Sequence, residues 1–466
     1  ITYNREHISS LGLTEPEIAA CVLHEIGHIT IGLQDSITEI EAVEKEIKCD
    51  QYASLYGFGI SLMTALFRMS ELIEPNALQL RLESLAQQSV IYRPVWTCGR
   101  YNATKGCAIM YNLVAGMSYY FEGESAEFIG LLLSKKRWQM YKFHSLSQEL
   151  NADIISTLAF LSQLIEIGLV STRHYSTEDI QQYKEEMLLQ RKMSLLSGAP
   201  KQGHHTDDAF ERSEAEELYL EKSGICGAVM FEMTYRCSEK CIHCYNPGAS
   251  RNENEVANRG HESGELHFED YVAIIDDLYD NGLFKVCLSG GDPFSKSCVW
   301  QVIEYLYEKD IAFDVFTNGL SLAGKEERLG KYYPRTVGFS VYSLLPDVHD
   351  GITRVPGSLE VTTRVARKIS ELSISEYVKC CVMKNNMGSY STVYAFANEI
   401  GATVQVDMNV SNSIDGDHCV SCYLKPSESD YKVLLRDPNA IMYVGLDNIT
   451  PVTYEEANCI RICKRS

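Results

Sequence analysis

The sequence lacks the long apolar runs of membrane proteins. The apolar stretch at residues 59–67 (GISLMTALF) is far shorter than the roughly 20 residues of a spanning helix. A cationic, apolar leader of the secretory type is also missing at its start, which is Ile1. Acidic residues outnumber basic ones, and the net charge of −21 argues against a nucleic-acid partner, whose phosphates would need a basic face. We therefore expect a cytoplasmic protein that binds neither membrane nor nucleic acid.

A disulfide framework is not expected either, although the chain has 16 cysteines. Cys237, Cys241 and Cys244 are too clustered to pair easily with one another, and Cys380 and Cys381 lie in an apolar run typical of a buried strand. Metal-bound or buried thiols in a reducing compartment fit this placement better. At 466 residues the chain is too long for one ordinary core, so we expect about two to four domains.

The most informative stretch is MTYRCSEKCIHCYN, residues 233–246, which places three cysteines in a C-x3-C-x2-C spacing. Thiolates are the usual protein ligands of iron–sulfur clusters. The thiols of Cys237, Cys241 and Cys244 can hold three irons of a [4Fe-4S] cube and leave the fourth iron open to a small chelating ligand. The alternative is a zinc loop with a distant fourth ligand, although paired C-x2-C knuckles are more typical of structural zinc.

With the aromatic Tyr245 beside its last cysteine, this loop resembles that of radical SAM enzymes, and the resemblance covers roughly residues 225–410. In that family the open iron binds S-adenosylmethionine. One electron from the cluster cleaves this cofactor to a 5′-deoxyadenosyl radical, which abstracts a hydrogen atom from the substrate. The resemblance therefore implies a [4Fe-4S] cluster, S-adenosylmethionine and an external electron donor.

Residues 225–410 alternate short apolar runs with helical stretches, which predicts a parallel α/β sheet. About six such units would form a partial (β/α)6 barrel of the TIM-like kind, with its site at the C-terminal ends of the strands. The fold class that we predict is thus α/β and multidomain, with a mainly helical zincin-like domain and a winged-helix module before the barrel.

Short polar motifs follow the predicted strands of this barrel. Residues 288–293 (LSGGDP) resemble the G-G-E-P motif of the family, with Asp292 in place of the glutamate, and the resemblance implies contact with the amino group of the methionine moiety. Loops use the same residue types for turns, which is the alternative for each position. The candidate cofactor-binding residues are Gly290, Gly291, Asp292, Pro293, Thr317, Asn318, Ser340, Ser343, Arg354 and Asn386.

Residues 1–92 contain the motif H-E-I-G-H within a predicted helix. On a helix this pattern puts both imidazoles on one face, with the glutamate placed to act as a general base. Glu46 lies three residues before Cys49 and resembles the third zinc ligand of zincin peptidases, with Cys49 in place of the usual alanine. The alternative is a helical domain that keeps the pattern with no metal, or with structural metal only. The candidate Zn²⁺ ligands are His24, His28 and Glu46, and the candidate catalytic residue is Glu25.

Residues 93–172 predict a small sheet followed by three helices. This order resembles the winged-helix elements that bind leader peptides of ribosomally made natural products by strand addition. An ordinary winged-helix packing domain is the alternative. Residues 173–224 are rich in charge and predict a linker of two helices around a break at residues 198–205.

Residues 411–466 carry four further cysteines in two pairs. Peptide-modifying radical SAM enzymes often have a C-terminal SPASM or twitch extension that holds auxiliary clusters. Because the sequence ends three residues after the last of these cysteines, the resemblance implies one auxiliary iron–sulfur cluster at most. Zinc, or thiols without a metal, are the alternatives. The candidate ligands are Cys419, Cys422, Cys459 and Cys463.

Together these patterns predict a radical SAM enzyme that modifies a ribosomally made precursor peptide by a thioether or carbon–carbon cross-link, with peptide cleavage as an added activity. Three other functions are compatible with the same residues. They are a zinc metallopeptidase with an iron–sulfur sensing domain, a radical SAM enzyme acting on RNA, and a non-catalytic peptide-docking scaffold.

Overall fold

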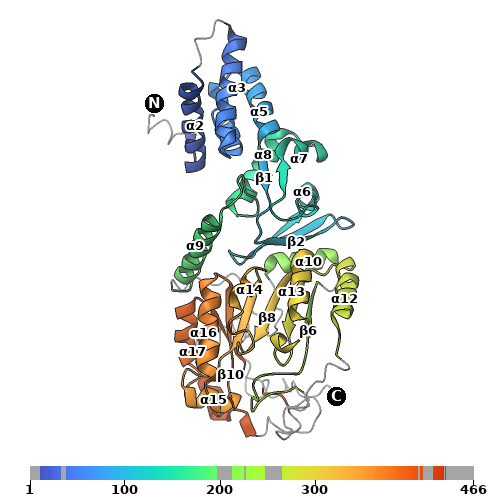
Figure 1. The fold of residues 1–466 in the computed structure, drawn as a ribbon, viewed down its shortest axis with the longest axis vertical. Helices are drawn as coiled ribbons and strands as arrows, with labels where there is room; N and C mark the ends of the chain where they lie inside the picture. The colour runs from blue at the N-terminus through green and yellow to red at the C-terminus, as the bar shows by residue number, and fades with distance from the viewer. Residues whose placement is uncertain are drawn as a thin grey trace. The chain divides into compact units, whose positions relative to one another are not determined.

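The computed structural model describes most of the chain, namely residues 11–32, 38–196, 213–224, 227–246, 265–407, 410–412, 423–434 and 436. The chain divides into two compact units (Figure 1). The first unit is Ile1–Asn112 with Tyr119–Gln181, and the second unit is Leu113–Ser118 with Gln182–Ser466. None of the described helices is both long and apolar enough to cross a membrane.

The first unit begins with a helical region, as the sequence predicts. Its first helix starts at Thr14, whose backbone N–H donates to the Glu17 carboxylate (2.7 Å), and stops at Gly32, where φ is 63°. The elements of this region are α2 (Glu15–Ile31), α3 (Glu39–Leu55), α4 (Gly59–Arg68), the 3₁₀ helix η1 (Ser70–Leu72) and α5 (Pro75–Gln88).

A small antiparallel sheet and three helices follow. The sheet has the strand order β2-β3-β4, and a separate pair joins β1 to β5. The last helix starts at Asp153, which accepts a hydrogen bond from the backbone N–H of Ser156 (2.9 Å). The elements are β1 (Val90–Tyr92), β2 (Thr97–Asn102), β3 (Cys107–Asn112), β4 (Met117–Glu122), α6 (Gly123–Leu133), β5 (Met140–Lys142), α7 (Phe143–Glu149) and α8 (Ile154–Glu166). The predicted sheet and helices are present, and their assignment to a winged helix stays a prediction.

One hydrophobic core joins the early helices of the first unit to its later elements. Ala53 and Leu66 from the early helices belong to the same buried cluster as Ile91, Phe128 and Leu161. The sequence predicts separate domains for residues 1–92 and 93–172, whereas the described residues of both pack around this shared core. The reason is that α4 and α5 bury their apolar faces against later elements and not only against α2 and α3.

The predicted linker contributes two helices, α9 (Thr177–Leu196) and α10 (Glu214–Ser223). The second half of α9 belongs to the second unit. There the guanidinium of Arg191 donates to the backbone oxygens of Ile374 (3.0 Å) and Val114 (3.1 Å). This part of the chain is therefore more than a solvated connector.

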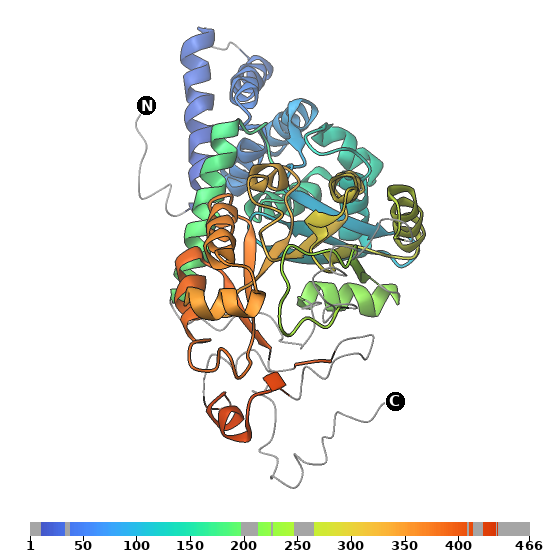
Figure 2. The same ribbon diagram turned by 60° about the horizontal axis from the view of Figure 1, so that its bottom comes forward.

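The second unit is built on six parallel strands in the spatial order β11-β10-β9-β8-β7-β6 (Figures 1 and 2). Each strand lies beside the next one in the chain, which confirms the predicted parallel α/β sheet of six units. The strands are β6 (Ala228–Glu232), β7 (Lys285–Ser289), β8 (Ala312–Thr317), β9 (Thr336–Ser340), β10 (Ser375–Cys381) and β11 (Thr403–Asp407). The other elements are α12 (Phe268–Asp280), η2 (Pro293–Ser295), α13 (Val299–Glu308), α14 (Glu326–Gly330), α15 (Pro346–Thr353), α16 (Ser358–Glu371), α17 (Thr392–Ile400) and α19 (Glu428–Leu434).

The strands are apolar because helices cover them. Val286, Val315, Phe339 and Val378 are fully buried in one core with the inner faces of the helices. A parallel sheet with covered faces needs such near-continuous apolar strands. At the amino-terminal ends of the strands, Lys285 pairs with Glu216 of α10 (2.9 Å). The polar loops that follow the strands lie at the opposite, carboxyl-terminal ends.

Candidate functional sites

A cavity of about 410 Å³ opens at the carboxyl-terminal ends of the parallel strands. The three clustered cysteines line it together with the loops that follow the strands. Its described lining includes Tyr235, Cys237, Glu239, Cys241, His243, Cys244, Tyr245, Asn246, Ser289, Gly290, Gly291, Phe316, Thr317, Asn318, Ser340, Tyr342, Lys379, Cys381, Gln405 and Asp407. The sequence thus predicts the location of the cavity correctly.

The cysteine loop is held by backbone hydrogen bonds to the end of α15. The backbone N–H groups of Lys240 and Ile242 donate to the carbonyl oxygens of Thr353 and Ile352, both at 2.9 Å. A turn between Cys241 and Cys244 (3.2 Å) closes its second half. The loop therefore has a defined course although it contains neither helix nor strand.

Cys237 accepts two hydrogen bonds at its sulfur. Its Sγ accepts hydrogen bonds from the backbone N–H of Glu239 (3.4 Å) and from Nδ2 of Asn318 (3.2 Å). N–H groups aimed at sulfur favour the thiolate, and they tune an iron–sulfur cluster when one is bound.

The cysteines fit a metal cluster because all three line one cavity. Burial raises the pKa of Cys237 to about 12 and that of Cys241 well above its ordinary value, so both are protonated thiols until a metal replaces the proton. Among the described residues, the one group of three candidate ligand atoms within 4.8 Å of one another lies in the first unit, and the three sulfurs do not form a second such group.

Two residues of the cavity lining have buried polar atoms without a partner. In the described part of the chain, Nδ1 of His243 and Oδ1 of Asn246 are buried and make no hydrogen bond. Buried polar groups are normally satisfied, so these two atoms mark a polar region beside the cysteines.

The two glycines after β7 allow one loop to lie directly on another. A Cβ on Gly290 would lie 2.4 Å from the carbonyl oxygen of Thr234, and a Cβ on Gly291 would lie 2.4 Å from that of Arg236. Gly290 also has φ of 124°, which favours glycine. The backbone N–H of Gly291 donates to Thr234 (2.6 Å). Both glycines line the cavity, and their first role is to let the loop that leads into the cysteines pack directly against this one.

Asp292 is fully buried and faces the protein, not the cavity. Its Oδ1 accepts from the N–H of Phe294 (2.9 Å), and its Oδ2 accepts from Oγ1 of Thr317 (2.6 Å) and the N–H of Asn318 (3.2 Å). Pro293 is buried beside it in η2. Asp292 therefore organises the loop after β8, and its contact with the cofactor stays a prediction.

The remaining predicted cofactor residues fall into two groups. Thr317, Asn318 and Ser340 line the cavity at the ends of β8 and β9. Ser343 and Asn386 are fully buried outside the lining, and Arg354 is exposed at the end of α15, where its φ is 57°. A role for these last three as direct cofactor contacts stays a prediction.

Some lining residues were not found from the sequence. Lys379, Cys380 and Cys381 line the cavity at the carboxyl-terminal end of β10. Tyr342 also lines it, with its ring 4.8 Å from that of His243 and 5.4 Å from that of His349. The signal available in the sequence was their position at the end of a predicted strand.

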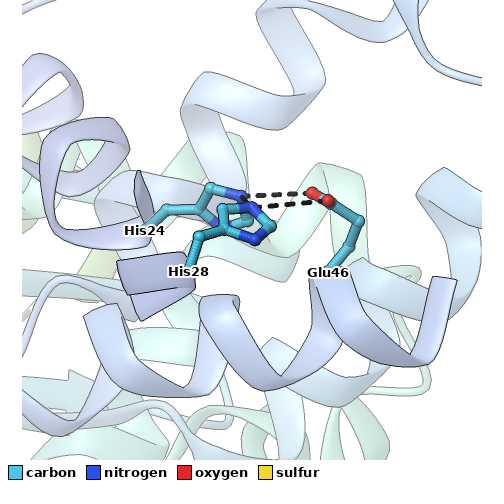
Figure 3. A group of neighbouring side chains, drawn as sticks. All are labelled: His24, His28 and Glu46. Atoms are coloured by element: carbon cyan, nitrogen blue, oxygen red, sulfur yellow. Dashed lines mark hydrogen bonds and ion pairs between the residues drawn. The ribbon is translucent and has the colours of Figure 1, made fainter. Parts of the chain in front are cut away.

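The first unit holds a candidate metal site formed by α2 and α3 (Figure 3). Nε2 of His24 lies 3.1 Å from one carboxylate oxygen of Glu46, and Nε2 of His28 lies 3.4 Å from the other. The two imidazole nitrogens are 3.2 Å apart. All three predicted ligands converge on one point, which is the arrangement that a single Zn²⁺ ion needs.

The site forms because α2 and α3 touch. A Cβ on Gly27 would lie 3.1 Å from Cα of Cys49. A glycine on one helix and a small residue on the other let the backbones approach, and the histidines then face Glu46 across the contact. Cys49 therefore has a packing role at the position of the usual alanine.

A second layer of contacts orients the ligands. Nδ1 of His24 lies 2.8 Å from Oδ1 of the buried Asp50. Arg81 from α5 donates to both oxygens of Asp50 (2.7 Å each) and lies 3.3 Å from Glu46. Burial alone would lower the pKa of His24, but Asp50 and Glu46 outweigh it and raise that pKa to about 9. A carboxylate beside a histidine commonly fixes the orientation of a metal-binding imidazole. Arg81 was not among the residues predicted from the sequence.

Glu25 lines a second, largely apolar cavity of about 310 Å³ beside these ligands. Its lining is Leu11, Leu13, Ile18, Cys21, His24, Glu25, Glu46, Leu62, Leu66, Met69, Ile73 and Arg81. The predicted catalytic residue thus shares a pocket with the candidate zinc site. The predicted auxiliary ligands Cys419, Cys422, Cys459 and Cys463 lie outside the described residues.

Residues 231–387 match the Radical SAM superfamily. The second unit therefore contains a radical SAM domain, and the cofactors of this family are a [4Fe-4S] cluster and S-adenosylmethionine. The match covers the cysteine loop, the two glycines, the end of β6 and the whole of β7, β8, β9 and β10.

Two of the curated relatives that the chain matches are a bacteriocin biosynthesis protein and a maturase. The antilisterial bacteriocin subtilosin biosynthesis protein AlbA of Bacillus subtilis is 27% identical over 174 residues, 37% of this chain and 37% of AlbA. The mycofactocin maturase MftC of Mycobacterium ulcerans is 24% identical over 178 residues, 38% of this chain and 45% of MftC. The matched region spans less than half the length of either relative.

Among solved structures, Streptococcus suis SuiB bound to its precursor peptide SuiA aligns with a TM-score of 0.37 and 16% identity. The alignment covers 68% of this chain and 62% of that chain.

Proposed function

We propose that this chain is a radical SAM enzyme that modifies a ribosomally made peptide. The observation that carries the proposal is the cavity at the strand ends, where three cysteines, two close-packed glycines and Asn318 meet. The similarity to a bacteriocin biosynthesis protein and to a maturase supports a peptide as the substrate.

In this proposal the cluster and S-adenosylmethionine, when bound, supply the radical that removes a hydrogen atom from the substrate. The cysteines hold the cluster, and Asn318 orients Cys237 through its N–H···S contact. Gly290, Gly291, Thr317 and Ser340 form the wall against which the cofactor lies. The outcome on the peptide is a thioether or a carbon–carbon cross-link, and an external donor supplies the electron.

The leader of the peptide would bind the sheet of the first unit. In the order β2-β3-β4, strands β2 and β4 are the outer strands, so either can accept an added strand. Main-chain hydrogen bonds along such an edge would raise the local concentration of the core peptide.

The test uses anaerobically purified, reconstituted protein with a reductant, S-adenosylmethionine and candidate precursor peptides encoded beside its gene. We expect release of 5′-deoxyadenosine and a peptide mass lower by the hydrogens lost in cross-linking. Cys241→Ala should abolish both, and Cys298→Ala, a buried cysteine outside the cavity, should keep both. Release of 5′-deoxyadenosine without any modified peptide would reject the peptide substrate and keep the radical chemistry.

A second activity, metal-dependent peptide cleavage, is favoured by the convergence of His24, His28 and Glu46 beside Glu25. In this reading the bound zinc would activate a water and Glu25 would take its proton. Glu25→Gln should stop cleavage of the peptide while the zinc stays bound. Cleavage that continues in Glu25→Gln would show that another protein is responsible.

A further inference from the structure

Glu232 is the last residue of β6, at the edge of the cavity of the second unit. Its side chain is exposed, and Met230, two residues earlier on the strand, lines the cavity. Alternate residues of a strand share a face, so Glu232 lies on the same face of β6 as Met230. The chain then runs directly into the cysteine loop. A carboxylate thus stands at the point where the strand ends and this loop begins.

Two tyrosines hold the carboxylate of Glu232. Oη of Tyr235 donates to Oε2 (3.2 Å), and Oη of Tyr245 donates to Oε1 (3.5 Å). Tyr235 lies two residues before the first cysteine of the loop and Tyr245 directly follows the last, so both ends of the loop meet at one acid. Each carboxylate oxygen can accept a further hydrogen bond. The acid is therefore oriented and keeps acceptor capacity for a ligand.

The two tyrosine side chains are partly open to solvent. Tyr235 is 38% exposed and Tyr245 is 42% exposed, and both residues line the cavity. Lysine and arginine carry an apolar stem behind the charged head. Such a stem can pack on the aromatic surface while the head reaches the carboxylate, and a ring also attracts a cation directly. The combination of one acid and two open rings fits a basic side chain.

The described part of the protein supplies no cation to Glu232. Two cations of the same region pair instead with another acid, because Arg236 lies 3.8 Å and Lys296 lies 2.8 Å from Glu265. The net charge of the chain is −21, which also favours a positively charged ligand. A cation from outside would complete the arrangement of the acid and its two tyrosines.

We propose that Glu232, held by Tyr235 and Tyr245, binds a lysine or arginine side chain of the peptide at the edge of this cavity. The proposal rests on the proposed function and deepens it, because it assigns to the peptide substrate a basic residue near the residue that is modified. The amino group of S-adenosylmethionine is also a cation, and the test separates it from the peptide.

The test measures the binding of capped tripeptides to the reconstituted holoenzyme at saturating S-adenosylmethionine. The probes are acetyl-Gly-Lys-Gly-amide and acetyl-Gly-Arg-Gly-amide, each compared with the neutral acetyl-Gly-Gln-Gly-amide. Wild-type protein should bind a cationic probe about tenfold more tightly than the neutral one, the effect of one charge-assisted hydrogen bond. Glu232→Gln, which keeps the size of the side chain and loses its charge, should remove this preference. Glu304→Gln, an exposed glutamate of α13 outside the cavity lining, should keep it.

Tyr235→Leu is the second variant, because it removes one ring and one hydrogen-bond donor but no cysteine. It should reduce the preference several-fold. A wild-type protein without the preference, or a full preference in both variants, would overturn the proposal. Weaker binding of S-adenosylmethionine to Glu232→Gln with an unchanged tripeptide preference would also overturn it and assign the acid to the cofactor. Because these are binding measurements, a chain that modifies no peptide would end the proposed function and leave this test intact.

Discussion

The two candidate metal sites of this chain are held in different ways. In the first unit the ligands project from two helices that touch at Gly27 and Cys49, so the spacing is built into regular structure. In the second unit they lie on an irregular loop held by backbone bonds to the end of α15 and by Asn318. The helical site therefore takes its ligand spacing from one helix contact, with Asp50 and Arg81 behind the ligands, whereas the loop site takes it from several separate neighbours.

The largest expected effect concerns metal content. Cys241→Ala should lose nearly all iron and keep zinc, and the double variant His24→Ala, His28→Ala should do the reverse, because the two ligand sets belong to different units. Elemental analysis of anaerobically purified protein measures both metals. Variant His144→Ala, a histidine of the first unit outside the ligand group, is the control. Loss of both metals in either variant would contradict the independence of the sites.

The next effect compares glycines at the two sites. Gly291→Ala places a Cβ 2.4 Å from a backbone oxygen, so the cysteine loop must shift. We expect this shift to lower the free energy of unfolding by about 1–3 kcal/mol and to reduce the amount of bound iron. Gly27→Ala meets its neighbour only at 3.1 Å, and the helix gains roughly 0.5–1 kcal/mol from alanine, so the net change should be small. Chemical denaturation and metal analysis measure both. Equal losses in the two variants would remove the distinction between loop and helix.

A smaller effect is expected from the contacts behind the zinc ligands. Asp50→Asn removes the carboxylate beside Nδ1 of His24 and should lower zinc affinity about 10–100-fold, the usual result for such partners. Competition with a chromophoric chelator measures the affinity. Iron content should not change, and an unchanged zinc affinity would show that Asp50 serves only to pair with Arg81.

The smallest effect should come from Asn318→Leu, which removes one N–H donor from Cys237 without removing a ligand. The cluster should assemble and its reduction potential should fall, because hydrogen bonds to sulfur stabilise the reduced state. Potentiometric titration measures the shift. An unchanged potential would indicate that Asn318 acts only through its backbone.

Features with local sequence signals were predicted well. The spacing of Cys237, Cys241 and Cys244 indicates their common site, and the alternation of apolar and helical segments predicts the parallel sheet. The HExxH pattern places His24 and His28 on one helix face, because residues four apart lie on the same side.

Features that depend on long-range contacts were not predicted. Arg81 binds Asp50, which is 31 positions away in the sequence, and no motif near either residue predicts this ion pair. Asp292 looks like a ligand contact by its motif, yet three donors from its surroundings occupy its oxygens. The shared core of the first unit was not predicted for the same reason, because contacts between distant segments produce no local pattern in the sequence of either segment.

One set of contacts at the second site has a consequence for how a cluster would be assembled. The side chain of Asn318 reaches Cys237, its backbone is held by Asp292, and the N–H of Asp292 donates to Arg236 (2.9 Å), the residue before Cys237. These hydrogen bonds connect Cys237, Asn318, Asp292 and Arg236 in a ring, so Cys237 is held both through its sulfur and through the residue before it. An arriving iron atom would thus find its first ligand already held in place, and the backbone bonds of Lys240 and Ile242 to α15 spare the loop most of the roughly 1–2 kcal/mol per residue that ordering a free chain costs. We expect apo protein to take up iron and sulfide without refolding, from Cys237 outward.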